Sequence, residues 1–275
     1  MCELLAISSK FPTRATFSLE EFSRHGGQGG PNKDGWGLAF YEDGDAKVFR
    51  EAEPAQDSRW MLFLTHHQHQ SRCIISHIRR ATQGARTLRN TQPFSRKICG
   101  FTHVFCHNGN LVNIRDRVGE THFRPLGETD SEYAFCYLCA QVENLWRQAK
   151  PGLGARIALV QSVFDRFATL GPANFLYSDG EYLYAYANRR TQASGRIEPP
   201  GLYYLCRDCD CDREAPPLAG LELDYHGVNP RQTVVLFASV PLSSEPWRPF
   251  AENQLIVAAN GQILGSPAAF DLGNV

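Results

Sequence analysis

The sequence has no excess of either charge and no long run of apolar residues. Its 275 residues include 28 Lys and Arg against 29 Asp and Glu, which gives a formal net charge of −1. This balance argues against a general polyanion binder, so we expect no nucleic-acid partner. The chain also has no run of about 18 apolar residues, the length that a membrane-spanning helix needs. We therefore expect no membrane association.

We also expect no cleavable secretory signal. The first apolar stretch, residues 4–7, is too short for the core of a signal peptide, and Glu3 lies on the wrong side of it. The nine cysteines are odd in number, and some of them, such as Cys106, lie in apolar runs. A buried free thiol behaves as a small hydrophobe. Because reduced thiols are typical of the cytoplasm, we expect a cytoplasmic protein.

Three cysteines have a spacing that suits a metal ion. Cys206, Cys209 and Cys211 lie close together, but only His226 is near them. No second pair of Cys or His follows at the distance that zinc sites usually show. We expect no metal and no cofactor, although the sequence leaves open whether these three thiols bind zinc.

Short strands joined by turns dominate the chain. The strands are predicted over 35–41, 46–50, 73–78, 101–106, 174–177, 182–186, 233–240, 254–259 and 262–265. The strongest hairpin signal is the Asn260-Gly261 pair between the last two strands. One helix is predicted to start at Thr129, because Thr129 and Glu132 fit a capping box. Another is predicted over about 154–170, where apolar residues recur at helical spacing.

The order of these elements favours one layered domain. Shorter helices are predicted from Ser18 and over about 56–66. Strands occur in clusters with helices between them and no regular βαβ alternation, which favours an α+β fold over a doubly wound sheet. No repeat or long linker divides the chain, so we expect a single domain over 1–275. Residues 198–220 are rich in Pro, Cys and charge and are predicted to be an irregular insertion.

Cys2 follows the initiator methionine directly. If Met1 is removed, this residue carries both a thiol and a free α-amine. An α-amine has a reference pKa of about 7.7–8.0, so a useful fraction is neutral near neutral pH. The amine can then accept the thiol proton, and no histidine is required. By itself, a cysteine at position two is better explained by chance.

A possible oxyanion site closes one predicted strand, where Asn108 and Gly109 follow an apolar run. The side-chain NH₂ of Asn108 and the backbone N–H of Gly109 can direct two donors at one developing oxyanion. The simpler interpretation of the same residues is an ordinary Asn-Gly turn.

Two further groups suit a free amino acid. Arg79 follows a predicted strand and can hold a carboxylate with its guanidinium fork, with the Thr82 hydroxyl beside it. Asp130 begins a predicted helix, where the helix dipole favours a carboxylate, and it can receive an ammonium group. Four arginines lie between Arg79 and Arg89, which is also typical of a nucleic-acid patch, but no aromatic residues are interleaved with them.

Taken together, the order of these motifs resembles the class II glutamine amidotransferases, which are N-terminal-nucleophile (Ntn) hydrolases. The motifs occur in the order Cys2, Asp34-Gly35-Trp36-Gly37, Arg79 with Ala81-Thr82, Asn108-Gly109 and Thr129-Asp130-Ser131-Glu132. The resemblance covers roughly residues 2 to 265 and is closest to stand-alone members without a synthase domain. It implies a four-layer αββα sandwich of two mostly antiparallel sheets and hydrolysis of a γ-glutamyl amide.

The resemblance also implies a role for each motif. Cys2 is the expected nucleophile, and Asn108 with the Gly109 amide is the expected oxyanion hole. Arg79 is expected to bind the α-carboxylate of glutamine, and Asp130 its α-amine.

The sequence departs from the family pattern at two positions near the expected carboxylate site. Many members have an aromatic residue after the motif arginine and a histidine after its threonine, whereas this chain has Arg80 and Gln83. These departures leave the carboxylate site in place but affect the expected closure of the loop and the choice of acceptor.

The implied reaction is attack by the Cys2 thiolate on the side-chain amide of glutamine or a related γ-glutamyl compound. A thioester forms, and water then releases glutamate. Ammonia passes to an acceptor if a separate synthase partner exists. Without such a partner, the chain is an amidohydrolase of a γ-glutamyl peptide or metabolite. The sequence leaves the substrate and the oligomeric state open.

Two other classes of protein stay open. A non-catalytic, amino-acid-binding regulatory module would keep the same pocket and retain Met1. A papain-like protease would use Cys106 with a histidine. Cys106 and His107 are neighbours on a predicted strand, so their side chains face opposite ways, which argues against that protease.

Overall fold

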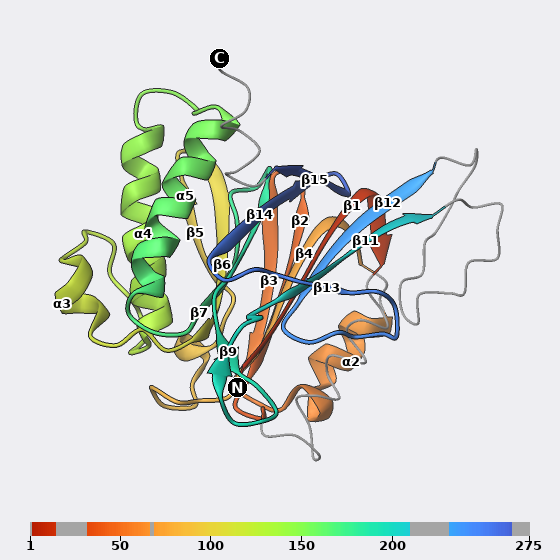
Figure 1. The fold of residues 1–275 in the computed structure, drawn as a ribbon, viewed down its shortest axis with the longest axis horizontal. Helices are drawn as coiled ribbons and strands as arrows, with labels where there is room; N and C mark the ends of the chain where they lie inside the picture. The colour runs from red at the N-terminus through yellow and green to blue at the C-terminus, as the bar shows by residue number, and fades with distance from the viewer. Residues whose placement is uncertain (1, 15–31, 67–68, 210–230, 266–275) are drawn as a thin grey trace.

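The structure is a computed structural model that describes residues 2–14, 32–66, 69–209 and 231–265. The described residues form two antiparallel sheets that pack face to face, with helices outside them (Figure 1). The expected αββα sandwich is therefore confirmed. No helix of the described ranges reaches the length and apolarity needed to cross a bilayer.

The first sheet has seven strands in the order β13-β11-β12-β1-β4-β2-β3. Their bounds are β1 Glu3–Arg14, β2 Trp36–Glu42, β3 Asp45–Glu51, β4 Gln70–Ile78, β11 Tyr203–Cys209, β12 Gln232–Ala238 and β13 Arg248–Pro249. The second sheet has six strands in the order β15-β14-β8-β7-β6-β5. Their bounds are β5 Phe94–Ile98, β6 Phe101–Gly109, β7 Ala173–Ser178, β8 Leu183–Ala187, β14 Gln254–Ala259 and β15 Gln262–Gly265.

Helices cover the outer faces of both sheets. The helices and small elements are α2 Arg59–His66, α3 Ile114–Val118, α4 Asp130–Trp146, α5 Leu153–Ala168, the 3-10 turns Ala55–Asp57 and Leu88–Asn90, and the ribbon of β9 Arg190–Thr191 and β10 Ile197–Glu198. Figure 1 shows α4 and α5 along the second sheet and α2 on the other side of the sandwich. The predicted helices over 154–170 and 56–66 correspond to α5 and to a 3-10 turn followed by α2.

Strand alternation divides the apolar side chains among three layers. On β6, Val104 and Cys106 lie in the layer between the sheets, whereas Phe105 packs with the residues of α4 and α5. Successive side chains of a strand point to opposite faces. The same alternation continues to the end of β6, so Asn108 faces the space between the sheets and His107 faces the helices. Two neighbouring side chains at the end of β6 therefore lie in different layers, one between the sheets and one between the second sheet and the helices.

The start of α4 differs in one detail from the predicted capping box. The Thr129 side chain accepts a hydrogen bond from the Glu132 amide at 3.2 Å, as expected. The buried Glu132 carboxylate does not reach back to Thr129. It accepts hydrogen bonds from the amides of Leu126 and Gly127, at 3.0 and 2.6 Å, and pairs with Arg96 at 3.0 Å. Glu132 therefore fixes the loop before the helix.

The predicted irregular insertion is partly wrong. Tyr203–Cys209 forms β11 and pairs with β12 over its whole length, because its apolar residues continue the first sheet. Residues 210–220 of this segment lie outside the described residues, as does the predicted helix from Ser18. Cys206 is exposed, and Cys211 is not among the described residues, so the expectation of no metal at these thiols stays a prediction. The single domain over 1–275 likewise stays a prediction.

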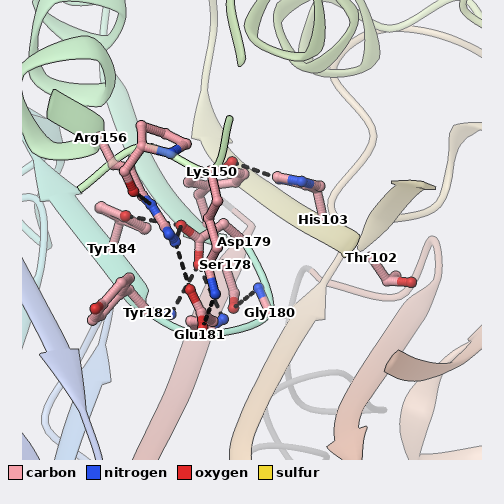
Figure 2. Close-up of polar contacts among 12 residues, drawn as sticks. Thr102, His103, Lys150, Arg156, Ser178, Asp179, Gly180, Glu181, Tyr182 and Tyr184 are labelled. Atoms are coloured by element: carbon pink, nitrogen blue, oxygen red, sulfur yellow. Dashed lines mark hydrogen bonds and ion pairs between the residues drawn. The ribbon is translucent and has the colours of Figure 1, made fainter. Parts of the chain in front are cut away.

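A buried cluster of charges ties α5 to the turn between β7 and β8 (Figure 2). Arg156 Nη1 lies 3.0 Å from Asp179 Oδ2 and 2.9 Å from Glu181 Oε2. The Tyr184 hydroxyl also donates to Asp179 Oδ2, at 3.0 Å. The Arg156 guanidinium lies 4.4 Å from the ring centroid of Trp146. Since every charge in the cluster has a partner, we interpret it as a structural link between the helices and the second sheet.

Candidate active site

The predicted site residues come from different strands that end at the same edge of the sandwich. Cys2 precedes β1, and Arg79 follows β4, whose Ile78 pairs with Glu3. Asn108 lies at the end of β6, beside the start of β7. The antiparallel register of each pair thus brings together residues that are far apart in the sequence.

The Cys2 thiol is held by the backbone of Arg80. The Arg80 N–H donates to Cys2 Sγ at 3.2 Å, and the thiol donates to the Arg80 carbonyl at 3.3 Å. Burial raises the pKa of the Cys2 thiol, while the Arg80 N–H and the Arg79 charge act in the opposite direction. A thiol in this setting is mostly protonated at rest, so its use as a nucleophile requires a nearby base.

The side chain of Asn108 is buried and directed at Cys2. Its Nδ2 donates to the Cys2 carbonyl at 2.6 Å and to Ser239 Oγ at 3.4 Å. Ser239 follows β12 and bonds twice to Leu4, since its amide donates to the Leu4 carbonyl and its Oγ accepts from the Leu4 amide, each at 3.0 Å. The amide of Asn108 is therefore fixed beside the residue that carries the thiol.

Gly109 occupies a position that has no room for a side chain. A Cβ there would lie 1.8 Å from the Pro172 carbonyl oxygen and 2.6 Å from His107 Nε2. Such contacts are far inside the van der Waals limit, so only glycine fits without moving the backbone. The shared role of Asn108 and Gly109 as an oxyanion hole stays a prediction.

Arg79 is 3% exposed and its fork faces the loop that follows it. Nη2 donates to the carbonyls of Gln83 and Gly84, at 3.0 and 3.1 Å, and Nη1 donates to the carbonyl of Ala85 at 3.2 Å. These contacts use three of the five N–H donors of a guanidinium. Burial lowers the pKa of Arg79, and the neighbouring Cys2 and Asp34 raise it.

Thr82 lies in the same loop but is exposed. The structure therefore brings Arg79 to the site and leaves the Thr82 side chain on the surface of the loop.

Asp130 is the first residue of α4 and is half-buried. Its Oδ1 accepts from the Ser131 amide at 2.8 Å, and its Oδ2 accepts from the Leu111 amide at 2.7 Å. Asp130 thus connects α4 to the segment that follows Gly109. The carboxylate keeps further acceptor capacity for an ammonium group, because an ionised carboxylate has about four lone-pair sites.

Sequence comparisons identify the family of this chain. A family model described as class II glutamine amidotransferases matches residues 1–270. The chain belongs to the class II glutamine amidotransferases. YafJ of Escherichia coli K12, provisionally named a glutamine amidotransferase, is 32% identical over 250 residues, which are 90% of this chain and 93% of YafJ. A relative in Haemophilus influenzae with a similar provisional name is 32% identical over 97% of this chain and 88% of its own length.

Solved structures agree with this assignment. A 2.0 Å crystal structure of a protein described as a predicted glutamine amidotransferase, from Pseudomonas aeruginosa, has a TM-score of 0.66 and 27% identity, over 96% of this chain and all of that one. The glutamine phosphoribosylpyrophosphate amidotransferase of Bacillus subtilis has a TM-score of 0.55 and 14% identity, over 96% of this chain and 48% of its own. The second match shows the fold alone. The Ntn-type fold that the resemblance implied is thus confirmed.

In this class II amidotransferase, the Asp34-Gly35-Trp36-Gly37 motif supports the Arg79 loop. The Asp34 amide donates to the Arg79 carbonyl at 3.1 Å, and the Arg79 amide donates to the Gly35 carbonyl at 2.7 Å. The Asp34 carboxylate accepts from the Ala81 amide at 2.8 Å. A Cβ at Gly37 would lie 2.1 Å from the Gln92 carbonyl, so this glycine allows a close approach of two backbones.

Two glutamines also shape the site, and sequence reasoning missed one of them, Gln92. The Gln92 side chain makes two hydrogen bonds with the backbone of His107. Its Oε1 accepts from the His107 amide at 2.6 Å, and its Nε2 donates to the His107 carbonyl at 3.2 Å. Gln83 Nε2 donates to Asn110 Oδ1 at 2.6 Å and so joins the Arg79 loop to the segment after Gly109. The residue at this departure from the family pattern therefore makes a contact between the two loops.

A cavity among the described residues lies at the other end of the sandwich. Its volume is about 740 Å³, and residues such as Tyr41, Cys73 and Ser178 line it. None of the predicted site residues borders this cavity. Burial raises the pKa of Cys73 to about 12, which makes this thiol a poor nucleophile. We therefore place the candidate active site at the Cys2 end.

Proposed function

We propose that this protein hydrolyses the side-chain amide of glutamine, or of a related γ-glutamyl compound, through a thioester on Cys2. The observation that carries the proposal is the position of Cys2 Sγ. Sγ is within hydrogen-bond distance of both the N–H and the C=O of Arg80. Asn108 Nδ2 donates to the backbone carbonyl of the same cysteine. Membership in the class II glutamine amidotransferases supports glutamine as the substrate class.

The first step needs a base for the Cys2 thiol. After removal of Met1, the free α-amine of Cys2 accepts the thiol proton, and Sγ forms a bond to the amide carbon. The charge that develops on the amide oxygen is stabilised by the Asn108 side chain and the Gly109 amide. For this, Asn108 Nδ2 exchanges its bond to Cys2 O for one to the oxyanion.

The second step releases the amine. The protonated α-amine donates to the leaving nitrogen, the C–N bond breaks, and ammonia or an amine departs. Water then attacks the thioester, so that glutamate leaves and the thiol is restored. Atoms and charges balance without any cofactor in this sequence of steps.

The amino-acid head is bound at the buried side of the site. The donors of Arg79 that its own loop leaves unused bind the α-carboxylate, and Asp130 binds the α-amine. Binding of the α-carboxylate and the α-amine at the same time orients the side-chain amide of the substrate over the Cys2 thiol. Thr82 stays a predicted carboxylate ligand, which requires the exposed loop to move toward the substrate.

Glutamate release from glutamine tests the proposal. Wild-type protein is expected to release glutamate, whereas Cys2→Ala is expected to lose turnover. A variant with one residue inserted between Met1 and Cys2 is expected to be equally inactive, because its thiol is no longer next to a free amine. Normal glutamate release by either variant would refute the mechanism.

Two alternatives are separated by simple measurements. A non-catalytic binding module is expected to keep Met1 and to bind glutamine without turnover, which intact-mass analysis and calorimetry detect. A separate synthase partner is expected to consume the ammonia. Without such a partner, ammonia and glutamate appear in equal amounts in solution.

A further inference from the structure

Two consecutive arginines beside the nucleophile are used in opposite ways. Arg79 is buried and its fork is directed into its own loop. Arg80 holds Cys2 Sγ with its backbone, but its side chain is exposed. The position of Arg80 is also the one where many members of the family have an aromatic residue. The exposed guanidinium therefore distinguishes this site from the common pattern.

The Arg80 side chain has no partner within the described ranges of the chain. Other arginines of the same loop are engaged, since Arg86 Nε donates to the Ala52 carbonyl at 2.6 Å and Arg89 pairs with Glu128 at 3.4 Å. No hydrogen bond or ion pair joins the Arg80 guanidinium to another described residue. The carboxylate of Asp34, which supports this loop, accepts from the Ala81 amide. A charge is thus available at this position.

The backbone contacts fix where that charge can act. Because both the N and the O of Arg80 lie within hydrogen-bond distance of Cys2 Sγ, the Cα of Arg80 lies beside the nucleophile. The leaving group of a substrate is bonded to the carbon that Sγ attacks. With the amino-acid head on the buried side, near Arg79 and Asp130, the leaving group extends toward solvent. The flexible Arg80 side chain can reach it there.

We propose that Arg80 binds a negatively charged leaving group, so that γ-glutamyl amides of amines bearing a carboxylate are preferred substrates. Amino acids and peptides have this chemistry. The inference rests on the proposed function and adds a substrate class to it. The bond changes are the same, because the amide C–N bond breaks, the Sγ–C bond forms, and the amine leaves with the proton that the thiol lost.

A matched pair of substrates tests this assignment. γ-Glutamylglycine and γ-glutamylglycinamide are almost equal in size, but only the first has an anionic leaving group. The quantity to measure is the ratio of their kcat/KM values in each variant, because differences in intrinsic reactivity then cancel between variants. Arg80→Gln is expected to lower this ratio up to about 5-fold, the upper range for an exposed charge pair. Arg80→Lys, which keeps the charge, is expected to retain most of it.

Arg72→Gln is the matched control. Arg72 is an exposed arginine of β4, the strand that precedes Arg80. It lies at the other end of the sandwich, where it borders the cavity described above. The ratio is expected to stay at its wild-type value in this variant. Raising the salt concentration is expected to lower the ratio in wild type but not in Arg80→Gln, because salt screens exposed charges.

The outcomes separate the two claims. An equal ratio in wild type and Arg80→Gln, with both proteins active, overturns the role of Arg80 and leaves the proposed function intact. A wild-type protein that hydrolyses neither peptide nor glutamine overturns both. If Arg80→Gln fails to fold, the same comparison is made with Arg80→Lys and Arg80→Met. In the Cys2→Ala background, calorimetry then measures binding of the two peptides, and equal affinity contradicts the proposal.

Discussion

The Nδ1 atom of His107 lies 2.9 Å from the Oγ atom of Ser131. This contact joins the residue before Asn108 to the residue after Asp130. Ser131 Oγ also lies 3.3 Å from Asp130 Oδ1, and the His107 ring stacks on Phe175 with centroids 4.9 Å apart. One buried hydrogen bond thus connects the proposed oxyanion hole to the proposed binding site for the α-amine.

This connection predicts a selective effect of Ser131→Ala. Loss of the hydrogen bond loosens Asp130, so KM for glutamine is expected to rise about 5-fold, the equivalent of about 1 kcal/mol, with little change in kcat. Glutaramate, which lacks the α-amine, is expected to show no change. Ser95→Ala, at a half-buried serine of β5, is the control. An equal effect on both substrates would indicate a general loss of structure instead.

Gly109→Ala is expected to abolish activity. The new Cβ would overlap the Pro172 carbonyl, so the strand end must move and the Asn108 amide moves with it. Removal of one oxyanion donor typically costs about 10²–10³ in turnover, and we expect a loss at least that large. Gly154→Ala is the control, because a Cβ there meets open space within α5. The control is expected to remain active and to be slightly more stable.

The buried His77 predicts a loss of stability in acid. Its side chain is 0% exposed, and neither ring nitrogen has a hydrogen-bond partner in the part of the chain that the structure describes. Burial lowers the pKa of His77 to about 3. The unfolded chain binds this proton with a pKa of about 6.5. Unfolding therefore takes up a proton between these two values, and stability falls as the pH decreases through that window.

The His77→Leu variant measures this contribution. When the pH is lowered from about 7.5 to about 5, His77 is expected to lower the free energy of unfolding of wild type by about 2 kcal/mol. His77→Leu is expected to lose correspondingly less over the same interval in denaturant titrations. The control is His122→Leu, at an exposed histidine paired with Glu143, and it should follow wild type. Identical pH dependence of wild type and His77→Leu would contradict the prediction.

The Arg156 cluster predicts a stability effect without a change in chemistry. Arg156→Ala leaves the buried Asp179 without its partner, and breaking a buried pair typically costs about 3–5 kcal/mol. The cluster joins α5 to the β7–β8 turn (Figure 2). This turn follows the end of β7 that lies away from Asn174, the residue paired with Asn108. Glutamate release per folded molecule should therefore match wild type below the unfolding transition. Arg89→Ala, at an exposed pair, should change stability by less than about 1 kcal/mol.

Local signals in the sequence were sufficient for much of the fold. The Thr129 cap and the alternation of apolar residues on β6 depend on a few neighbouring residues, and the structure has both. By contrast, β11 was missed because the Pro, Cys and charge of its segment masked the apolar residues that pair with β12. Local composition does not reveal such long-range pairing.

Prediction of the candidate site required more than local signals in the sequence. Cys2 and Asn108 are 106 residues apart, and only the resemblance to a family suggested that they meet. Ser239 contacts Leu4 across 235 residues, and no motif marks it. The resemblance also could not show that Arg79 donates to three carbonyls of its own loop. These contacts depend on the sheet order, which determines which strand ends are neighbours.

Reaction with a thiol-reactive diazoketone analogue of glutamine, followed by intact-mass and peptide analysis, tests the central claim most directly. The account predicts a protein that lacks Met1 and carries a single adduct on Cys2, with free glutamine protecting against the reaction. Cys106 should stay unmodified, because it is fully buried and burial raises the pKa of its thiol. An adduct on Cys106, or a protein that retains Met1 and gains no adduct, would contradict the account.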